Sequence, residues 1–402
     1  MERRVISVLH HSLPMINGKL AEEDGQGWHF RSAKALRTLG EYTVEAVRPS
    51  GGKYCLVKII DDVPLILTPT ARLSPSGRLW KWDEVSPALV KYVVHKALRE
   101  EYVPYIHEYR ALNSELIIRS LIDRPLILQH HGARPPTRRL GLSPIDMIKE
   151  VSKLKRESLL KKVKGVIFVV NIREKEYLED ILGVDAEVVF RTMAVDFDRL
   201  KPPSPEEKER IREELKMPKD AVVVASYMGV FGEEAGYIKG ARLAPLIWRW
   251  LRDRYGDKAA MVVTGVSGRS LELYRRLGIT AYPYLPHAEF IKIVKASDVY
   301  ILPATPGYYG GPGVAVMEAM ALGKPVVAST FLEMPRETMP SIGAVAAPYI
   351  NTERDLAIFL RKLEYVIDNI NDYDPWHIRS EAYKVFSWHS FVKDFNRALS
   401  KL

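Results

Sequence analysis

The sequence predicts an α/β protein made of two doubly wound, Rossmann-like halves that face each other across a cleft. Short runs rich in β-branched residues, such as 163–170, 221–227 and 259–264, alternate with helical patterns along the chain. This alternation is typical of parallel sheets with helices on both faces. A proline-rich stretch around a charged helix, residues 198–220, interrupts the pattern and indicates the junction between the two halves.

The elements of the first half can be placed in order from its start. Residues 1–9 form an apolar run that predicts a buried strand. After a long connection, Gly25 and Gly27 precede a helical pattern. Two later apolar runs, 105–109 and 125–132, predict strands that end in polar residues. We therefore expect polar side chains at the carboxyl ends of several parallel strands, where ligands bind in such sheets.

Length and composition are those of a globular protein of two or three domains. The chain has 402 residues, of which 47% are hydrophobic. No apolar run approaches the roughly 20 residues that a membrane-spanning helix needs, and the first residues turn polar too soon for a signal peptide. Cys55 is the only cysteine, which excludes an internal disulfide and indicates a reducing compartment. We expect a cytoplasmic protein.

The net charge of +9 favours an anionic partner, such as a phosphorylated substrate, a lipid surface or a nucleic acid. Solubility alone is an equally good explanation of such a charge. Charge is the only feature that points to nucleic acid, so we expect no nucleic-acid partner.

Residues 310–327 form the most informative segment of the chain. A glycine-rich loop, with Gly310, Gly311 and Gly313, is followed by a short helix that begins near Val314, and then by a glycine and a buried strand. Unpaired N–H groups and the helix dipole at such a helix start attract an anion, and glycines let the backbone approach it. Glu318, about one and a half turns into the helix, is placed to bind a ribose diol.

This segment resembles the donor-site signature of family 4 glycosyltransferases, which have the GT-B fold. The signature has two glutamates with seven residues between them, and the second is followed by Ala-Met-Ala and, further on, by Gly and Pro-Val. Glu318 matches the second glutamate, whose role in the family is to hold the donor ribose. The first glutamate, which contacts the donor sugar, falls at Gly310 and is absent. Pro312 makes this loop tighter than the usual form. Any side chain at Gly310 would add strain if its φ were positive, and Tyr308 or Tyr309 is a candidate to fill the gap.

Lys239 is the candidate for a diphosphate contact. It follows a glycine-containing loop and, with Gly240, is predicted to open an amphipathic helix, where a lysine can pair with phosphates. The family usually has an arginine just after the strand and a lysine a few residues on. The resemblance assigns the lysine to Lys239, and Val230 stands at the arginine position. A solvated surface lysine is the alternative. Gly265, after another strand, is a modest candidate for a nucleotide loop.

Three histidines end predicted strands of the first half: His11, His107 and His131. Histidine suits proton handling and hydrogen bonding near neutral pH, although a lone histidine is more often structural. The setting of His131 resembles a family strand end at which a histidine contacts the reacting sugar. We expect His130 to face inward and pack, and His107 to be structural.

The basic run 149–164 carries apolar residues at helical spacing: Val151, Leu154, Leu159, Leu160 and Val163. A basic amphipathic helix of this kind can lie on an anionic membrane surface, which would make the protein peripheral on the inner face of the membrane. The alternative is a surface helix that packs on its own domain.

The resemblance implies three parts: an acceptor-side domain over 1–198, a donor-binding domain over 199–375, and a helix over 376–402 that crosses back to the first domain. It implies a hexosyltransferase that moves a sugar from a nucleoside diphosphate sugar to the hydroxyl of a glycan, a lipid-linked sugar or a small molecule. It also implies retention at the anomeric carbon, no metal and no cofactor, and the sequence shows no metal-ligand spacing.

The predicted site residues fall into two groups. His131 and Lys239 are the catalytic candidates. The donor-binding candidates are Glu318, Gly310, Gly311, Gly313, Val314, Gly25, Gly27 and Gly265. The absent glutamate and arginine motivate an alternative from another class, a non-catalytic sugar-nucleotide-binding protein or partner subunit of the same fold.

Overall fold

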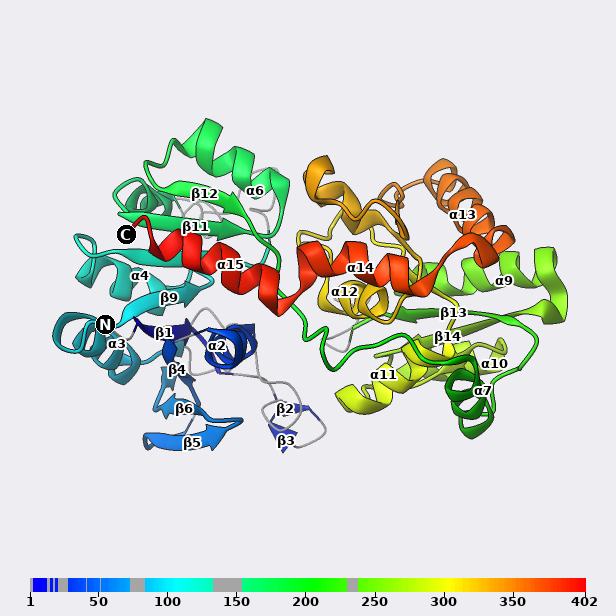
Figure 1. Cartoon of the computed structure of the whole chain (residues 1–402), viewed down its shortest axis with the longest axis horizontal. Coiled ribbons are helices and arrows are strands. Elements are labelled where there is room, and N and C mark those ends of the chain that lie inside the picture. Colours follow the sequence, from blue (N-terminus) through cyan, green and yellow to red (C-terminus); the bar gives the residue numbers. More distant parts are fainter. Residues whose placement is uncertain are drawn as a thin grey trace. The chain divides into compact units, whose positions relative to one another are not determined.

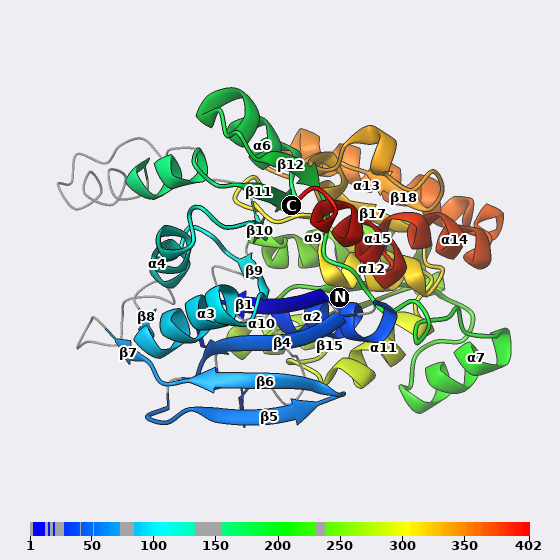
Figure 2. The ribbon, with the colours of Figure 1, turned by 60° about the vertical axis from the view of Figure 1, so that its left-hand side comes forward.

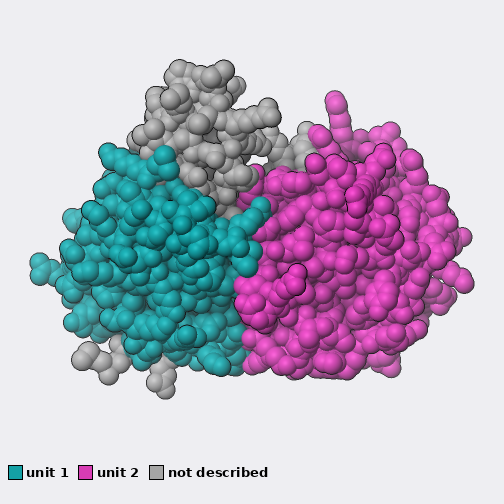
Figure 3. Space-filling view, turned by 90° about the horizontal axis from the view of Figure 1, so that it is seen from above, with its two compact units in different colours: residues 1–194, 388–402 teal, residues 195–387 magenta. Residues whose placement is uncertain are grey.

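The computed structural model describes residues 3–12, 15–16, 19–20, 28–40, 42–50, 52–72, 84–132, 154–229 and 238–402. The chain forms two compact units, coloured separately in Figure 3. The first comprises Met1–Ala194 and Trp388–Leu402, and the second comprises Val195–Ser387. Each unit contains a sheet of parallel strands between helices, so the prediction of two Rossmann-like domains is confirmed.

The first unit is built on an eight-stranded sheet with the order β12-β11-β10-β9-β1-β4-β6-β5 (Figure 1). Its neighbouring strands are parallel, except that β5 runs antiparallel to β6. The strands are β1 (Arg3–Leu9), β4 (Tyr42–Pro49), β5 (Leu56–Ile60), β6 (Val63–Thr68), β9 (Val103–His107), β10 (Leu126–His130), β11 (Gly165–Val169) and β12 (Glu187–Phe190). Two short antiparallel pairs accompany it: β2 (Met15–Ile16) with β3 (Lys19–Leu20), and β7 (Ala71–Arg72) with β8 (Glu84–Val85).

Helices cover both faces of this sheet because successive strand residues point to opposite sides. In β1, Val5 packs with α2 (Trp28–Leu39) and α15 (Trp388–Leu399), whereas Ile6 and Val8 pack with α3 (Pro87–Arg99) and α4 (Leu112–Ser120). Helix α3 begins with Pro87 after Ser86, whose hydroxyl accepts a hydrogen bond from the Leu89 amide. A shorter helix, α6 (Ile172–Glu176), follows β11.

The closing segment of the chain differs from its prediction. A single helix was expected over 376–402, but the structure has α14 (Pro375–Phe386) in the second unit and α15 in the first. Ser387 separates them because its extended backbone, with ψ 156°, ends α14. Phe391 and Phe395 of α15 are buried in the core of the first unit, so α15 alone returns to it.

The second unit has a six-stranded parallel sheet with the order β15-β14-β13-β16-β17-β18. Its strands are β13 (Val222–Tyr227), β14 (Ala259–Thr264), β15 (Thr280–Ala281), β16 (Val299–Leu302), β17 (Val326–Ala328) and β18 (Ala344–Ala346). Its helices, in addition to α14, are α7 (Pro205–Glu214), α9 (Ala244–Tyr255), α10 (Gly268–Arg276), α11 (His287–Ala296), α12 (Val314–Ala321) and α13 (Glu353–Asp368). The chain proceeds outward from β13 to β14 and β15 and then returns to place β16 on the other side of β13. The strand order therefore reverses between β13 and β16, and such a switch point is where doubly wound sheets bind ligands.

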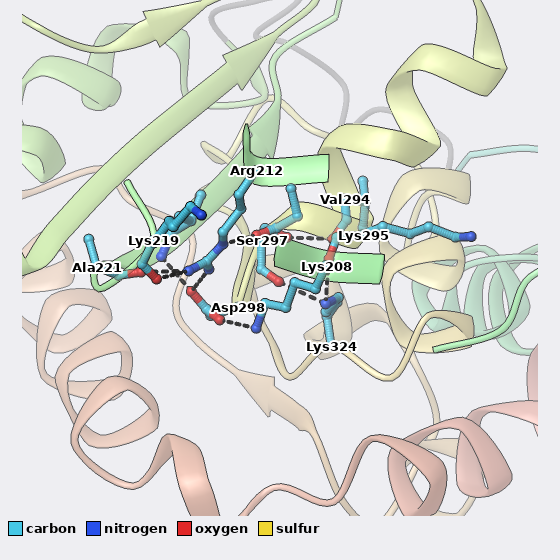
Figure 4. A network of polar contacts seen from close by, with 11 residues as sticks. Lys208, Arg212, Lys219, Ala221, Val294, Lys295, Ser297, Asp298 and Lys324 are labelled. Carbon is cyan, nitrogen blue, oxygen red and sulfur yellow. Dashed lines mark hydrogen bonds and ion pairs between the residues drawn. The ribbon is translucent and has the colours of Figure 1, made fainter. Parts of the chain in front are cut away.

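A polar network ties α7 to the amino ends of the central strands (Figure 4). The Asp298 carboxylate, just before β16, accepts hydrogen bonds from Arg212 Nη2 at 2.5 Å and from the Val223 amide at 2.6 Å, and it also pairs with Lys208. The Arg212 guanidinium donates further to three backbone carbonyls, among them that of Ala296 at 2.9 Å. Asp298 thus anchors β13, β16 and α7 together.

Lys324 is a buried lysine beside this network. Its Nζ donates to the carbonyls of Lys295 at 2.9 Å and Ser297 at 2.7 Å. Burial, reinforced by the charge of Lys208, lowers the pKa of Lys324 from 10.5 to about 7. The folded protein therefore holds this lysine largely neutral at mildly alkaline pH, whereas the unfolded chain holds it protonated.

We expect the stability of the protein to rise with pH between about 7 and 10.5 because of Lys324. In that window the unfolded state binds more protons at this group than the folded state does, which gives a slope of up to about 1.4 kcal/mol per pH unit. Lys324→Met should remove this part of the slope, and urea unfolding across the window measures it. Lys258→Met, on the surface of the same unit, is the control, and an unchanged slope in Lys324→Met would contradict the prediction.

Candidate functional site

The loop that contains Lys239 packs directly against the end of β16. Gly240 has φ 88°, and a Cβ there would lie 2.2 Å from the Pro303 carbonyl oxygen. The amide of Thr305, in the loop after β16, donates to the carbonyl of Ile238 at 3.0 Å. These contacts require glycine at 240 and place Lys239 at the carboxyl ends of the central strands.

The sequence suggested that Lys239 opens a helix, but in the structure it does not. The left-handed backbone of Gly240 interrupts the chain, and after a short 3₁₀ turn α9 begins at Ala244. The half-buried ammonium of Lys239 lies 4.8 Å from the ring centroid of Tyr227, the last residue of β13. Burial lowers the pKa of Lys239 to about 8, and within the described part of the chain no carboxylate pairs with it. A desolvated cation of this kind can bind an anionic ligand.

Gly265 belongs to the same group of residues. It follows β14 with φ 73°, and a Cβ there would lie 2.6 Å from the Tyr227 ring and 3.1 Å from the Gly229 amide nitrogen. Gly265 thus lies against the edge of the Tyr227 ring, and the ammonium of Lys239 lies over the ring. The structure therefore brings Lys239 and Gly265 together through Tyr227.

The glycine loop leads into α12 as the sequence indicated. Gly313, with φ 91° and ψ 138°, directly precedes Val314, the first residue of α12. The loop is held by two side chains: the Tyr308 hydroxyl donates to the Gly311 carbonyl, and the Thr330 hydroxyl donates to the Pro312 carbonyl, each at 3.0 Å.

Gly310 does not have a positive φ; Gly313 does. The strain that would follow from a left-handed Gly310 is therefore absent, and the obstacle to a side chain there is a different one. A Cβ at this position would lie 2.6 Å from the hydroxyl of Tyr308 and 3.0 Å or less from two atoms of its ring. Tyr308 is buried, so it occupies the space next to Gly310.

Glu318 is buried on α12 and faces α11. Its Oε1 lies 2.8 Å from Nε2 of His287, the first residue of α11, whose side chain is 43% exposed. Nearby in β16, the Tyr300 hydroxyl accepts a hydrogen bond from the Tyr227 amide at 3.1 Å. Burial raises the pKa of Tyr300, and the Glu318 charge raises it further. The sequence analysis missed His287; a histidine directly after a proline at a helix start was the available signal.

The first unit gathers six of the ten histidines of the chain at the carboxyl ends of β1, β9 and β10 and the start of α2. They are His10, His11, His29, His107, His130 and His131. Five of them are 8% exposed or less, and burial lowers the pKa of each ring for which a shift is resolved: His29, His107 and His131. Burial therefore favours the neutral form of these three rings.

A hydrogen-bond chain fixes which nitrogen of His131 carries its proton. The Ser7 hydroxyl donates to the His29 carbonyl at 2.8 Å, so the hydroxyl proton is committed. His107 Nε2, 3.1 Å from the same oxygen, must then donate to it, and its Nδ1 must accept. His131 Nε2, 2.8 Å from that Nδ1, is therefore the donor, and His131 Nδ1 bears the lone pair.

Glu108 holds the neighbouring backbone in place. It has a left-handed φ of 63°, its Oε2 lies 2.6 Å from His130 Nδ1, and its Oε1 accepts from the His131 amide at 3.3 Å. Burial alone would raise the pKa of Glu108, but the charge of His130 lowers it well below its usual range. His130 is buried against Tyr109, as expected for a packing residue.

The described part of the basic run, 154–164, packs on its own domain. Leu160 and Val163 are buried in the core of the first unit, and Arg156 Nε donates to Glu115 Oε2 at 2.9 Å. Lysines of the run remain exposed, and so does Leu154, whose side chain is 54% exposed. Binding to an anionic membrane remains a prediction. Within the described residues, no helix has the length and apolarity to cross a bilayer.

Three predicted positions lie outside the described residues: Gly25, Gly27 and Val230.

Residues 224–368 match a family model described as glycosyl transferases group 1. This stretch runs from β13 to the end of α13 and includes Lys239, Gly265, His287 and Glu318. The matched stretch lies within the second unit. A curated relative, the amylovoran biosynthesis glycosyltransferase AmsK of Erwinia amylovora, is 32% identical over 110 residues. That alignment spans 27% of this chain and 26% of the relative, so the chain matches about a quarter of the length of AmsK.

Solved structures of glycosyltransferases resemble the whole chain in fold. Sucrose-phosphate synthase of Thermosynechococcus elongatus superposes with a TM-score of 0.70 at 15% identity, covering 99% of this chain and 98% of that one. A glycosyltransferase of Rickettsia africae gives 0.66 at 15% identity and 99% coverage of both chains. HepE of Anabaena, solved with UDP and glucose, gives 0.64 at 15% identity and 100% coverage of both. These likenesses establish the GT-B fold.

We expect His131 to titrate at about pH 4, well below the ordinary 6.5, because burial disfavours its protonated form. The Glu108 carboxylate opposes this shift, so Glu108→Gln should move the midpoint to still lower pH. NMR titration of histidine-labelled protein measures both midpoints and reports the protonated nitrogen. A wild-type midpoint near 6.5, or a proton on Nδ1 at neutral pH, would refute the arrangement derived from the Ser7 chain.

Proposed function

We propose that this protein is a glycosyltransferase that moves a sugar from a nucleoside diphosphate sugar to an acceptor hydroxyl. The observation that supports the proposal is the position of two residues in the stretch that matches the glycosyl transferases group 1 model: Lys239 lies beside Tyr227 at the end of β13, and Glu318, next to His287, lies on the helix after β16. A cation without a carboxylate partner in the described chain and a buried carboxylate at one switch point suit a ligand with both phosphates and a sugar diol.

Each group has a distinct role in this proposal. Lys239 binds the diphosphate and offsets the charge that develops on it as the glycosidic bond breaks. Glycines 311 and 313 bring backbone amides at the start of α12 close to the same phosphates. Glu318 accepts hydrogen bonds from the ribose hydroxyls, and His287, bonded to one of its oxygens, holds the carboxylate in place.

The first unit supplies the sugar-facing and acceptor-facing groups in this proposal. A neutral His131 ring can accept a hydrogen bond from a sugar hydroxyl, whereas an imidazolium cannot. The resemblance to family 4 adds retention at the anomeric carbon and independence of a metal. Ligands bound in structures of similar fold support the donor class: HepE was solved with UDP-glucose, and the trehalose-6-phosphate protein of E. coli was solved with UDP-2-fluoro glucose.

The second candidate function is a sugar-nucleotide-binding protein without catalytic activity. Gly310 and Val230, at the positions of the family's glutamate and arginine, favour it. Release of nucleoside diphosphate by the purified chain, with a panel of sugar nucleotides and acceptors, separates the two functions. Donor binding detected by thermal shift without any turnover would support the second.

The ionisation of Lys239 should govern the alkaline limb of the pH–rate profile. The ammonium is needed for the diphosphate, and its pKa of about 8 means that it is present below pH 8 and lost above it. We expect kcat/KM for the donor to fall about tenfold by pH 9, since this parameter follows the free enzyme.

Lys239→Arg provides the matched variant for this experiment. Arginine stays protonated across the range, so its profile should be flat to pH 9 or beyond, whatever its absolute rate. Lys239→Met should be impaired at every pH, and Lys258→Arg should keep the wild-type profile. An alkaline limb that persists in Lys239→Arg would assign the ionisation to another group.

Gly310→Glu tests whether the chain is a decayed enzyme. We expect it to impair turnover, because the new side chain must displace the buried Tyr308 ring and break its bond to the Gly311 carbonyl, at about 0.5–1.5 kcal/mol for the hydrogen bond alone. Adding Tyr308→Ala makes room for the glutamate and should recover part of the lost thermal stability. A large gain of activity with Gly310→Glu alone, on several donors, would favour the non-catalytic alternative.

A further inference from the structure

The outermost strand of the first sheet, β5, is open along one edge. It stands last in the strand order, and in the described part of the chain β6 is its partner (Figure 2). The side chains of Leu56, Val57 and Ile59 are 53%, 67% and 74% exposed. Monomeric proteins usually protect such an edge with charges, prolines or a covering helix. Here only Lys58 interrupts the apolar run.

The other edge of the same sheet is protected. At β12, Glu187 pairs with Lys401, whose Nζ lies 2.6 Å from its Oε2. An ion pair at this position places charge beside the strand, as edge strands of soluble proteins commonly do. The two edges of one sheet therefore differ: β12 carries an ion pair, whereas β5 carries one lysine among exposed apolar side chains.

The turn between β5 and β6 determines which backbone groups are free. Residues 61–62 form a two-residue hairpin loop, both with positive φ, which closes on the pair Ile60 and Val63. In an antiparallel ladder, hydrogen-bonded and non-hydrogen-bonded pairs alternate from that closing pair. The N–H and C=O groups of Val57 and Ile59 therefore point away from β6. The residues with open backbone groups are also the two most exposed β-branched residues of the strand.

We propose that β5 pairs antiparallel with β5 of a second copy of this chain, across a two-fold axis at Val57. An antiparallel strand pair is compatible with two-fold symmetry, so each copy satisfies the open edge of the other and the assembly closes at two. The two sheets then join into one continuous sheet. A second copy is the occupant that fits best, because the exposed edge is self-complementary in both its hydrogen bonds and its apolar side chains.

The axis is placed at Val57 by charge. An axis at Lys58 would set the two lysines opposite each other, and like charges in that position are destabilising. An axis at Val57 instead sets Lys58 opposite Leu56 of the second copy, where its aliphatic stem covers the leucine and its ammonium reaches water. It also sets Cys55, the exposed single cysteine, opposite Ile59 of the second copy.

The expected assembly is a weak dimer. The exposed apolar side chains of one short strand bury less surface than the roughly 1,200–2,000 Å² of stable interfaces, so we expect a dissociation constant on the order of 10 μM. Sedimentation velocity of the full chain from about 1 to about 100 μM should show a shift from monomer to dimer. A monomer at every concentration would overturn the proposal.

Two substitutions and a matched control locate the interface. Val57→Lys and Ile59→Lys each place a charge on the open edge and should leave the protein monomeric across this range. Ile181→Lys is the control, because Ile181 is also 74% exposed on the same unit but lies on a different surface. Unchanged thermal unfolding verifies that each variant folds. A dimer that persists in Val57→Lys and Ile59→Lys would show that another surface forms it.

A cysteine pair tests the register. Ile59→Cys should form a covalent dimer with the native Cys55 under mild oxidation, because directly opposite residues lie within the Cα separation of a disulfide. The dimer should disappear on reduction and be absent from Ile181→Cys. Covalent dimer in equal yield from both variants, or none from Ile59→Cys, would overturn the pairing of these strands about Val57.

Discussion

The pairing of β13 with β16 fixes the rest of the second unit, and Asp298 holds that pairing in place. Its amide donates to the Val223 carbonyl at 2.8 Å, and its carboxylate accepts from the Val223 amide at 2.6 Å. A buried carboxylate is costly unless it is paired and hydrogen-bonded, and Arg212 and Lys208 supply both kinds of partner. Because strand residues alternate in direction, a slip of one residue here would turn the loops at the other end to the wrong face. The site at the carboxyl ends depends on the ion pairs at the amino ends.

Two lysines of this unit show how the same physical effect serves structure and function. Burial lowers the pKa of both Lys324 and Lys239. Lys324 donates to two backbone carbonyls and so closes the network at the amino ends of the strands. Lys239 has only the face of Tyr227 as a neighbour of complementary charge in the described chain. A cation that is partly desolvated and incompletely satisfied gains more from an incoming anion than a solvated surface lysine does.

The sequence was sufficient for the architecture and for part of the site. Alternating apolar runs predicted two parallel-sheet domains, and the loop before Val314 predicted the start of α12, because both are properties of contiguous residues. The partners of the site residues were out of reach. His287 and Glu318 are 31 residues apart, and Ser7 and His107 are 100 apart, so only the folded chain brings them together. No periodicity encodes such a contact.

Local backbone geometry was the other source of error. The pattern around Lys239 suggested a helix start, but the close approach of Pro303 requires a left-handed Gly240, which delays α9 to Ala244. The tail was expected as one helix because its apolar periodicity continues, yet Ser387 divides it between two units. In both cases tertiary packing overrides local propensity, and one residue with a non-helical backbone is enough to do so.

The two units handle ionisable groups in opposite ways, and this contrast matches the two halves of the proposed donor. The second unit keeps a cation, Lys239, at the carboxyl ends of its strands, which suits the anionic diphosphate. The first unit has imidazoles at the carboxyl ends of its strands, and the hydrogen bonds of Ser7 and His107 determine which nitrogen of His131 is protonated. A neutral imidazole does not compensate the charge of a phosphate, so Lys239 has that role. A neutral imidazole can, however, accept a hydrogen bond from a sugar hydroxyl. Taken separately, the second unit therefore offers a cation that suits an anionic group, and the first unit offers imidazole nitrogens that suit hydroxyl groups.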